Sequence, residues 1–510
     1  MMMNSETPDE QEDKAEEICE KERICEELCI SAGETDIDEG AYAWSTGITR
    51  VVFEGSEVRE IKRCAFFGCT GLTEIEIPEG VREIGDMAFA TCEGLRRVTL
   101  PKTLRHIGRE AFAGCKRLRE IDIPETTEDF GLGAFKRCDG LEEIRLPRST
   151  RYLDAEAFEW CYKVAKIEAG ANYRFEEGIL YTSDMTHVIA VFDRACTNGG
   201  EVSIAEGTTD IGASAFATCH AKRVHLPATI TYVDETAFDG CSTLQAIEIE
   251  TGDIYTTWRG ILMRNGEIYR CPEGISEERI SIPRSVVAMR ERAFASCINI
   301  NAMEIDGSFT EIPSHAFERC EGLTHVELRG NIETVGEYAF AGCRNLRTVE
   351  TDNVLSAIGR SAFAECISMQ EAPIAESTTY IAEEAFAGCE GLTDIVWPES
   401  VSTLPNGVFA DCTRLKNVDL PDNMTAIGEQ AFMGCTALAH IELPKDLKEI
   451  GDSAFAYSGL ETVAVPETTI KIKGYAFGYC KHLQLATIPG HLTKDADKIF
   501  VECPRLEIIA

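Results

Sequence analysis

The apolar residues of this chain recur with a nearly constant spacing. An Ala-Phe pair is followed by a Cys three residues after the Phe, as in Ala111-Phe112-Ala113-Gly114-Cys115. Most steps between these phenylalanines are 23 residues, two are 22, and two are longer, at 58 and 56. The seventeen copies lie at Phe66, Phe89, Phe112, Phe135, Phe158, Phe216, Phe238, Phe294, Phe317, Phe340, Phe363, Phe386, Phe409, Phe432, Phe455, Phe477 and Phe500. A fixed period of this length is typical of a solenoid, in which stacked units share one core.

The residues after each Cys predict a short strand. In one unit these are Leu118, Ile121 and Ile123, followed by Pro124. Ile121 and Ile123 are two residues apart, so both point to the same face of a strand. Pro124 ends the strand because it has no N–H to donate. The residue between the two isoleucines, Asp122, is therefore expected to face outwards.

The second half of each unit is clearest in Val81-x-x-Ile84-Gly85-x-x-Ala88-Phe89. We expect Gly85 to permit a tight turn with positive φ, because glycine lacks a Cβ. Ala88 and Phe89 are then expected to be buried. The stacking of such units creates a continuous core.

The run C-x-x-L-x-x-I-x-I-P-x-x-V-x-x-I-G-x-x-A-F is similar to the BspA-like leucine-rich repeats, over about residues 47–510. The resemblance implies an α/β-type solenoid, a right-handed leucine-rich-repeat superhelix of about seventeen 23-residue units with a parallel concave β-sheet. The predicted domains are an acidic N-terminal segment over residues 1–40 and the solenoid over residues 41–510. The family resemblance also implies a role in adhesion or interaction, mostly at cell surfaces.

The two longer steps predict insertions at about residues 169–201 and 249–281. Asn265-Gly266 in the second insertion lies between two apolar runs, which is a strong signal for a β-hairpin. Both insertions are therefore predicted as hairpins that protrude near one another. Their aromatic side chains allow two interpretations, as anchors for a partner or as cover for the hairpins' own small cores. The candidates for partner contact are Tyr181, Phe192, Trp258 and Tyr269.

The outward middle positions of the predicted strands are rich in acidic residues. Nine of the sixteen are Glu76, Asp122, Glu168, Glu248, Glu304, Glu327, Glu350, Asp419 and Glu442. Glu304, Glu327 and Glu350 fall on three successive strands, and like charges directly opposite one another are destabilising. Either a bound basic segment or cation relieves this repulsion, or water solvates the carboxylates.

Sixteen of the 22 cysteines occupy one repeat position. In stacked strands they would lie about 4.8 Å apart, each with two equivalent neighbours, so no unique disulfide pairing is specified. Because Cys behaves as a small buried hydrophobe, we expect a reduced structural ladder that binds no metal.

Cys19, Cys25 and Cys29 precede the repeats. A predicted amphipathic helix starts near Thr7 and stops near Gly33, and its shared face carries Ala15, Ile18, Cys25, Leu28 and Cys29. A thiolate metal site is one interpretation, but the spacing matches no standard zinc pattern. The preferred interpretation is a cap over the first repeat, since terminal repeats need a polar outer face.

The formal charge of −38 comes from 87 acidic and 49 basic residues. It excludes nucleic acid, whose phosphates need Lys and Arg, and favours a protein partner with a basic surface. No apolar run reaches the roughly 18 residues of a membrane span, so no membrane insertion is predicted. The N-terminus lacks the basic start and apolar stretch of a secretory signal, which predicts a cytoplasmic location. The family resemblance implies the alternative, a cell-surface or secreted location.

No catalytic pattern is found. The sequence contains no P-loop, no dinucleotide fingerprint, no H-E-x-x-H and no nucleophile elbow. We therefore predict no enzyme, no cofactor and no metal, but a non-catalytic scaffold that binds proteins through the concave face and the hairpins. The alternative is a cell-surface adhesin or surface antigen. The uncapped strand at residues 506–510 also predicts weak end-to-end self-association.

Overall fold

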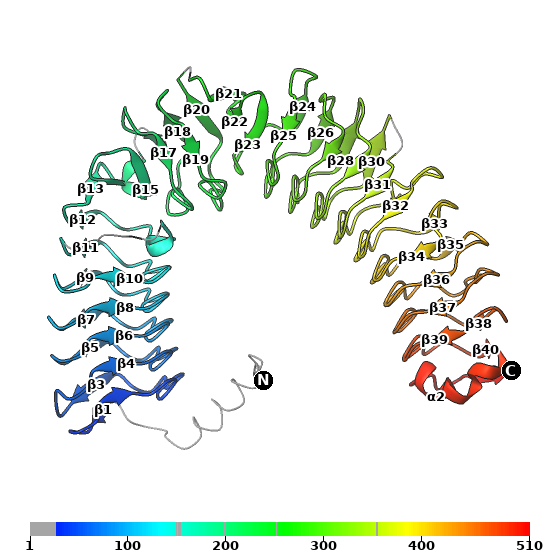
Figure 1. Ribbon diagram of the computed structural model, residues 1–510, viewed down its shortest axis with the longest axis horizontal. Coiled ribbons are helices and arrows are strands. Elements are labelled where there is room, and N and C mark those ends of the chain that lie inside the picture. Colours follow the sequence, from blue (N-terminus) through cyan, green and yellow to red (C-terminus); the bar gives the residue numbers. More distant parts are fainter. Residues whose placement is uncertain are drawn as a thin grey trace. The chain divides into compact units, whose positions relative to one another are not determined.

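The computed structural model is a parallel β-solenoid, which confirms the predicted fold class (Figure 1). It describes residues 27–148, 150, 153, 155–196, 199–250, 252–352 and 355–509. The chain divides into two compact units, unit 1 up to Tyr255 and unit 2 from Thr256. Helix in the described residues is confined to four short segments, η1 (Ala155–Phe158), η2 (Asp193–Ala195), η3 (Gly490–Asp495) and α2 (Ala496–Ile499). None of these has the length and hydrophobicity to span a bilayer.

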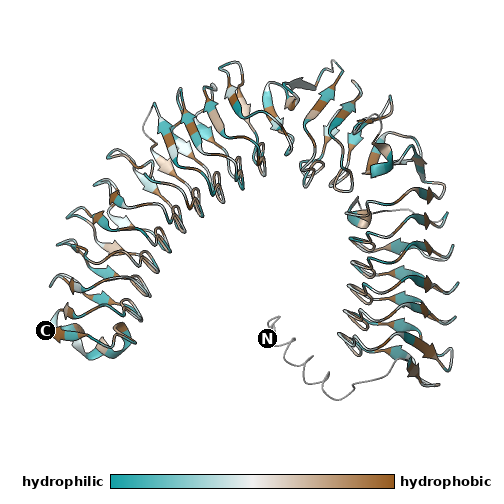
Figure 2. Cartoon of the chain, turned by 180° about the vertical axis from the view of Figure 1, so that it is seen from behind, coloured by the Kyte–Doolittle hydropathy of each residue, from teal (hydrophilic) through white to brown (hydrophobic). Residues whose placement is uncertain are grey.

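Most coils contribute one strand of three or four residues to a parallel sheet. Ile75 in such a strand is buried, whereas Glu74 and Glu76 on either side are exposed, and the same alternation of polar and apolar residues is visible in Figure 2. We call the outward side of these longer strands the strand face. In unit 1 they are β1 (Glu27–Ile30), β3 (Arg50–Phe53), β5 (Glu74–Glu76), β7 (Arg97–Thr99), β9 (Glu120–Asp122), β11 (Glu143–Arg145), β12 (Lys166–Glu168), β16 (Glu201–Ser203), β18 (Arg223–Leu226) and β20 (Ala246–Ile249). In unit 2 they are β24 (Arg279–Ile282), β26 (Ala302–Ile305), β28 (His325–Leu328), β30 (Thr348–Thr351), β33 (Asp394–Val396), β35 (Asn417–Asp419), β38 (Thr462–Ala464), β40 (Leu485–Thr487) and β41 (Glu507–Ile509).

A second set of parallel strands has two residues in each coil. Its second residue, such as Ile84, is buried, and the first is more exposed. In unit 1 the set comprises β2 (Asp36–Ile37), β4 (Glu60–Ile61), β6 (Glu83–Ile84), β8 (His106–Ile107), β10 (Asp129–Phe130), β17 (Asp210–Ile211) and β19 (Tyr232–Val233). In unit 2 it comprises β25 (Ala288–Met289), β27 (Glu311–Ile312), β29 (Thr334–Val335), β31 (Ala357–Ile358), β32 (Tyr380–Ile381), β34 (Thr403–Leu404), β36 (Ala426–Ile427), β37 (Glu449–Ile450) and β39 (Lys471–Ile472).

The motif residues form columns through the core of each unit. The rings of Phe66 and Phe89 stack with centroids 5.2 Å apart and an interplanar angle of 4°. The thiol of Cys92 donates a hydrogen bond to the carbonyl of Phe66 in the preceding coil, at 3.1 Å. Burial raises the pKa of Cys92. The cysteines of this column are therefore small buried side chains whose thiols satisfy backbone carbonyls, as their repeat position predicts.

The glycine of the repeat has a different role from the one expected. Gly85 does not have a positive φ; the left-handed residue of that turn is Met87, with a φ of 54°. A Cβ at Gly85 would lie 2.8 Å from the backbone nitrogen of Arg63 in the preceding coil. Glycine is thus required by the close approach of two backbones, and the expectation of a positive φ was wrong.

Three coils lack the Ala-Phe-Cys motif but occupy the same hydrogen-bonded ladder. The backbone N–H groups of Tyr42, Val191 and Cys271 donate to Ala65, Ala215 and Ala293, as those of the motif phenylalanines do to later alanines. Together with the seventeen motif copies they make twenty coils in the described part of the chain, nine in unit 1 and eleven in unit 2. The estimate of seventeen units was therefore slightly low.

The first of these coils changes the predicted N-terminal boundary. Glu27–Ile30 is the strand β1 and pairs in parallel with β3. The solenoid therefore begins before residue 41, and the predicted helix cannot continue to Gly33. Ile30 is buried in the core, and its burial in the stacked sheet explains why a strand replaces the end of the helix. The remainder of that helix, with Cys19 and Cys25, lies outside the described residues.

The two insertions contain the predicted hairpins, but the hairpins do not protrude. In the first, β13 (Tyr173–Glu176), β14 (Ile179–Thr182) and β15 (His187–Val191) pair in antiparallel fashion. β15 then pairs in parallel with β17 of the next coil. The second has β21 (Tyr255–Trp258), β22 (Ile261–Arg264) and β23 (Glu267–Arg270), and β23 pairs in parallel with β25. Each insertion thus builds a coil of the solenoid, because its last strand joins the two-residue strands.

The sequence signal at Asn265-Gly266 is confirmed in detail. These two residues connect β22 and β23 with φ angles of 51° and 82°. Two successive positive φ values are typical of the type I′ turn, which matches the twist of a two-residue hairpin.

Candidate functional site

The strand face of unit 1 carries more carboxylates than cations. Over β5 to β12 its outward charged residues are Glu74, Glu76, Arg97, Glu120, Asp122, Glu143, Arg145, Lys166 and Glu168. Six are acidic and three are basic. Parallel register places them side by side, since Glu120, Glu143 and Lys166 face one another on successive strands. All of them except Glu74 and Glu76 line an open cavity of about 350 Å³.

Arg145 organises the centre of this surface. Its guanidinium contacts Asp122 at 3.1 Å on one side and Glu168 at 2.7 Å on the other. Lys166 also pairs with Glu168, at 2.8 Å, and the hydrogen bonds from Lys166 and Arg145 lower the pKa of Glu168 to about 2. Glu168 therefore remains charged, and both it and Asp122 are paired with cations of the protein itself. No ion pair involves Glu74, Glu76 or Glu120 among the described residues.

In unit 2 the three glutamates predicted to repel one another do lie in register. Glu304, Glu327 and Glu350 are directly opposed on β26, β28 and β30. However, Arg279 reaches across two strands, to Glu304 at 3.5 Å and to Glu327 at 3.0 Å. The charges that relieve the repulsion are thus already present in the chain, which neither interpretation of the sequence foresaw.

Glu327 is the centre of this cluster. Its carboxylate also contacts Arg329 and, at 3.3 Å, His325. These donors, Arg329 first, lower the pKa of Glu327. Arg329 in turn pairs with Asp352 at 2.7 Å. Glu350 is the exposed member of the row, with 61% of its side chain accessible, and in the described residues its one ion-pair partner is His325 at 4.0 Å.

The remaining acidic candidates differ in their surroundings. Glu248 on β20 is paired with Arg223 and His225, each at 3.2 Å. Asp419 on β35 is exposed beside Val396 of β33. Glu442 is exposed but belongs to no strand, so the strand predicted around it is absent from this described segment.

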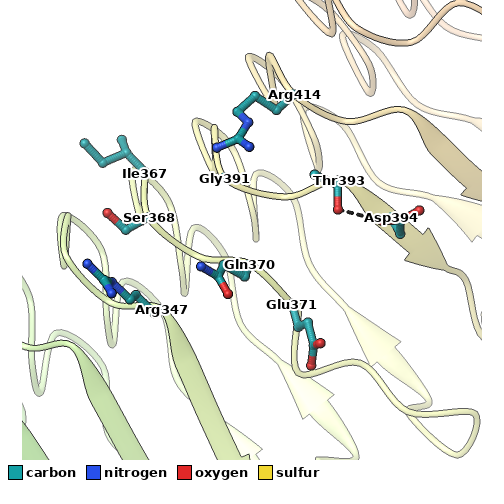
Figure 3. A pocket seen from close by; sticks show the side chains of 9 residues that line it. All are labelled: Arg347, Ile367, Ser368, Gln370, Glu371, Gly391, Thr393, Asp394 and Arg414. Carbon is teal, nitrogen blue, oxygen red and sulfur yellow. Dashed lines mark hydrogen bonds between the residues drawn. The ribbon is translucent and has the colours of Figure 1, made fainter.

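The strand face of unit 2 is interrupted at one coil. Pro373 takes the outward middle position of its coil, and residues 370–374 form no strand, as expected of a residue that cannot donate to the ladder. Next to the break lies an open cavity of about 690 Å³, drawn in Figure 3. Arg347 and Arg414 contribute cations to its lining, and Glu371 and Asp394 contribute carboxylates. The side chain of Asp394 accepts a hydrogen bond from Thr393 (Figure 3).

The aromatic candidates of the insertions are mostly not available to a partner. Tyr181, Phe192 and Tyr269 are 2%, 0% and 4% exposed. The Tyr181 hydroxyl accepts a hydrogen bond from the N–H of Ala205 at 3.2 Å. Their prediction as exposed anchors was wrong, because the insertions are coils of the core and the rings pack inside them. Trp258 is half-buried against the core of unit 2.

One cluster escaped the sequence-based predictions. Asp193, Cys196 and Cys219 bring a carboxylate and two thiols within 4.8 Å of one another at the end of the first insertion. The pattern D-x-x-C followed by Cys219-His220 could have indicated it, but Cys219 appeared to be one of sixteen equivalent cysteines. Cys196 comes next to Cys219 only because the insertion forms a coil of the solenoid.

The known proteins that this chain resembles are leucine-rich repeat proteins. No curated protein sequence matches the chain. Among solved structures, a leucine-rich repeat protein from Eubacterium ventriosum is 17% identical, covers 85% of this chain and 91% of its own, and has a TM-score of 0.40. A leucine-rich cell-surface protein from Faecalibacterium prausnitzii is 23% identical, with coverage of 82% and 87% and a TM-score of 0.38.

A model of one repeat family matches most of the chain. The model of the BspA type leucine-rich repeat region, which comprises six copies, matches residues 35–165, 190–258, 271–393 and 379–507. These matches include the coils built on the Ala-Phe-Cys columns, but they leave out most of the first insertion and the middle of the second. The chain therefore belongs to the family of BspA-type leucine-rich repeat proteins.

Proposed function

We propose that the protein is a non-catalytic interaction scaffold that binds a protein partner with a basic surface through its strand face. The observation that carries this proposal is the excess of ordered carboxylates on that face, six against three cations over β5 to β12. Membership of a repeat family built around an extended surface supports it.

The internal ion pairs fix the positions of some carboxylates and leave others available to a partner's cations. Arg145 holds Asp122 and Glu168 in place, so these side chains lose little further freedom when a partner binds. Glu74, Glu76 and Glu120, which have no ion pair in the described chain, are the ones that gain most from a partner's Lys or Arg. Each exposed pair contributes only about 0.2–1 kcal/mol, so binding requires several of them and weakens with salt.

The cavity beside Pro373 would give the strand face of unit 2 a deeper contact of its own. Its lining offers both charge signs, with Arg347 and Arg414 opposite in charge to Glu371 and Asp394. A concave polar site of this kind accepts one projecting side chain of a partner, and such central pockets carry much of the binding energy of an interface.

The test uses a synthetic peptide of alternating Lys and Ser residues, and the same peptide with Glu in place of Lys. The variant is the triple substitution Glu74→Gln, Glu76→Gln and Glu120→Gln. We expect the Lys peptide, and not the Glu peptide, to bind the unmodified protein in fluorescence anisotropy, with an affinity that falls as salt rises. The triple variant should bind at least about tenfold more weakly, which corresponds to about 1.4 kcal/mol.

The control has the same change in net charge away from the strand face. Glu34, Glu57 and Glu83 are exposed and lie on other surfaces of unit 1. Substitution of these three by Gln should leave the affinity for the Lys peptide almost unchanged. Equal losses in both triple variants would mean that only net charge matters, and the proposal of a strand-face site would be wrong.

A second candidate is a cell-surface adhesin or antigen, which membership of the BspA-type family favours. The two candidates differ in location. Protease treatment of intact native cells, followed by detection of the protein, separates them, because only a surface protein is digested. Protection from the protease would favour the interaction scaffold over the adhesin.

A further inference from the structure

The first insertion brings together four residues with metal-binding chemistry. Asp193 begins the short helix η2 and Cys196 caps its end. Cys219 and His220 belong to the next coil of unit 1. The two sulfur atoms are 3.3 Å apart, and the carboxylate oxygen of Asp193 lies within 4.8 Å of both.

The hydrogen bonding of Cys219 differs from that of the rest of its column. In neighbouring coils the Cys thiol donates to the carbonyl of the preceding coil, as Cys241 does to Phe216 at 3.3 Å. The corresponding carbonyl for Cys219 belongs to Val191, and the hydroxyl of Thr218 donates to it instead, at 2.6 Å. The sulfur of Cys219 is therefore released from its structural role and faces Cys196.

Asp193 is held in a defined orientation. Its Oδ1 accepts the backbone N–H of His220 at 2.7 Å, and its two oxygens lie 3.1 and 3.0 Å from Nδ1 of the same residue. The His220 ring packs against Tyr162, with centroids 4.8 Å apart. Carboxylates that ligate metal ions are themselves hydrogen-bonded by neighbouring groups, which orient them.

We propose that Asp193, Cys196 and Cys219 bind a thiophilic divalent cation of the Zn²⁺ class. Zinc takes thiolate sulfur at about 2.3 Å and carboxylate oxygen at about 2.0–2.2 Å in tetrahedral geometry, which puts two sulfurs roughly 3.8 Å apart. The observed separation requires the sulfurs to part by only about half an ångström. Two sulfur ligands disfavour Mg²⁺ and Ca²⁺, which prefer oxygen alone.

The protonation chemistry of the pair is compatible with this site. The two sulfurs share a hydrogen bond in which either can be the donor. A bound cation replaces the proton between the two sulfurs, so two protons are released as the two thiolates form. Asp193 and Cys196 are partly exposed, which leaves a path from solvent. The fourth position of the ion is open to water.

The consequence is a cross-link between coils. The cation joins the last turn of the first insertion to the coil that follows it, in a segment where the Ala-Phe-Cys motif is interrupted. Because a ligand that binds only the folded state stabilises it, Zn²⁺ should raise the thermal stability of the protein.

The experiment titrates the reduced, metal-free full-length chain with Zn²⁺ in competition with a chromophoric chelator. Co²⁺ serves as a spectroscopic probe, since sulfur ligation produces intense charge-transfer absorption in the near ultraviolet. The variants are Cys196→Ser, Cys219→Ser and His220→Asn. The matched control is Cys64→Ser, which removes another partly exposed cysteine of unit 1.

We expect the unmodified chain and the Cys64→Ser variant to bind one more equivalent of Zn²⁺ than the Cys196→Ser and Cys219→Ser variants. The charge-transfer band of Co²⁺ should disappear in the same two. His220→Asn keeps all three ligands and should weaken binding about 10- to 100-fold, which tests the site even where loss of the buried Cys219 impairs folding.

Two results would overturn the proposal. One is equal Zn²⁺ stoichiometry in the unmodified chain and the Cys196→Ser variant. The other is a Cys196–Cys219 disulfide in protein analysed by mass spectrometry without reduction, because the close sulfurs would then be explained by oxidation through exchange with a small-molecule disulfide.

Discussion

Single side chains of one type have different roles that depend on their position in the stack. Cys92 lies in the core column and its thiol donates to a backbone carbonyl, whereas the thiol of Cys219, in the same column, faces Cys196. The charged residues show the same dependence. Glu74 is free of ion pairs in the described chain, but Glu168 is held between Arg145 and Lys166.

The carboxyl group of Glu168 provides a pH-dependent test of the strand face. Its pKa is lowered to about 2 in the folded chain, so its pairing stabilises the native state above its usual pKa and is lost as pH falls towards 2. Carbon-13 NMR of the side-chain carboxyl should show this low pKa. The substitution Arg145→Ala should raise the pKa towards the ordinary value, and an unchanged titration would show that Arg145 is not its partner.

The glutamate row of unit 2 leads to a prediction opposite to that from sequence. Simple repulsion predicts that replacing Glu304, Glu327 and Glu350 by Gln stabilises the protein. Because Arg279 and Arg329 pair with Glu327, we instead expect Glu327→Gln to lower the denaturation midpoint and Glu350→Gln to leave it almost unchanged. Urea denaturation of the two single variants measures the difference. A higher midpoint for Glu327→Gln would restore the repulsion interpretation.

A buried ion pair in the second insertion should contribute more to stability than the exposed pairs of the strand face. Arg270 and Glu273 are 4% and 9% exposed at the side chain and 3.0 Å apart, and Arg270 also donates to the carbonyl of Arg292 at 2.9 Å. Removing one partner of a buried pair typically costs about 3–5 kcal/mol. We expect Glu273→Ala to lower the stability of unit 2 by this order in chemical denaturation. Glu278→Ala, at an exposed glutamate of the same insertion, is the control and should cost much less.

At the scale of strands and insertions, local sequence sets the turns, whereas stacking of the coils decides which strands pair. The hairpin turn at Asn265-Gly266 follows from local chemistry, because these residues tolerate positive φ. The position of the hairpin in the fold does not follow from local chemistry, because it depends on the parallel pairing of β23 with β25 in the next coil. The insertions are consequently coils of the scaffold and not appendages.

This role predicts that the first insertion is required for stability. Phe192 is fully buried and packs against Phe158, with centroids 6.1 Å apart. We expect Phe192→Ala to destabilise unit 1 by about 3–5 kcal/mol, as measured by chemical denaturation. An insertion that merely protruded would tolerate the substitution with little change.

Each unit as a whole is a stack whose coils contact mainly their neighbours, so its stability is close to a sum over coils and interfaces. Such a stack leaves an open edge wherever a strand has only one partner. β41 pairs with β40 alone among the described strands, and Ile508 and Ile509 on it are 39% and 48% exposed.

The open edge predicts weak self-association of the 510-residue chain. An exposed edge strand with apolar side chains pairs readily with another chain. Light scattering over a range of concentrations should show a rising mean mass for the unmodified protein. The double substitution Ile508→Lys and Ile509→Lys should abolish the rise, and a concentration-independent monomer mass before substitution would contradict the prediction.

The period of the motif, the alternation around Ile75 and the turn at Asn265-Gly266 were enough to predict the solenoid, its strands and its hairpins. These features depend on residues close together in the chain, where side-chain alternation and backbone preference act directly. Tertiary structure alone decided which charges are paired, why Gly85 is glycine, and that the insertions are buried coils. Those outcomes depend on contacts between coils, such as Arg279 with Glu327 and Cys196 with Cys219. Their geometry is set by the register of the stack, which no single repeat contains.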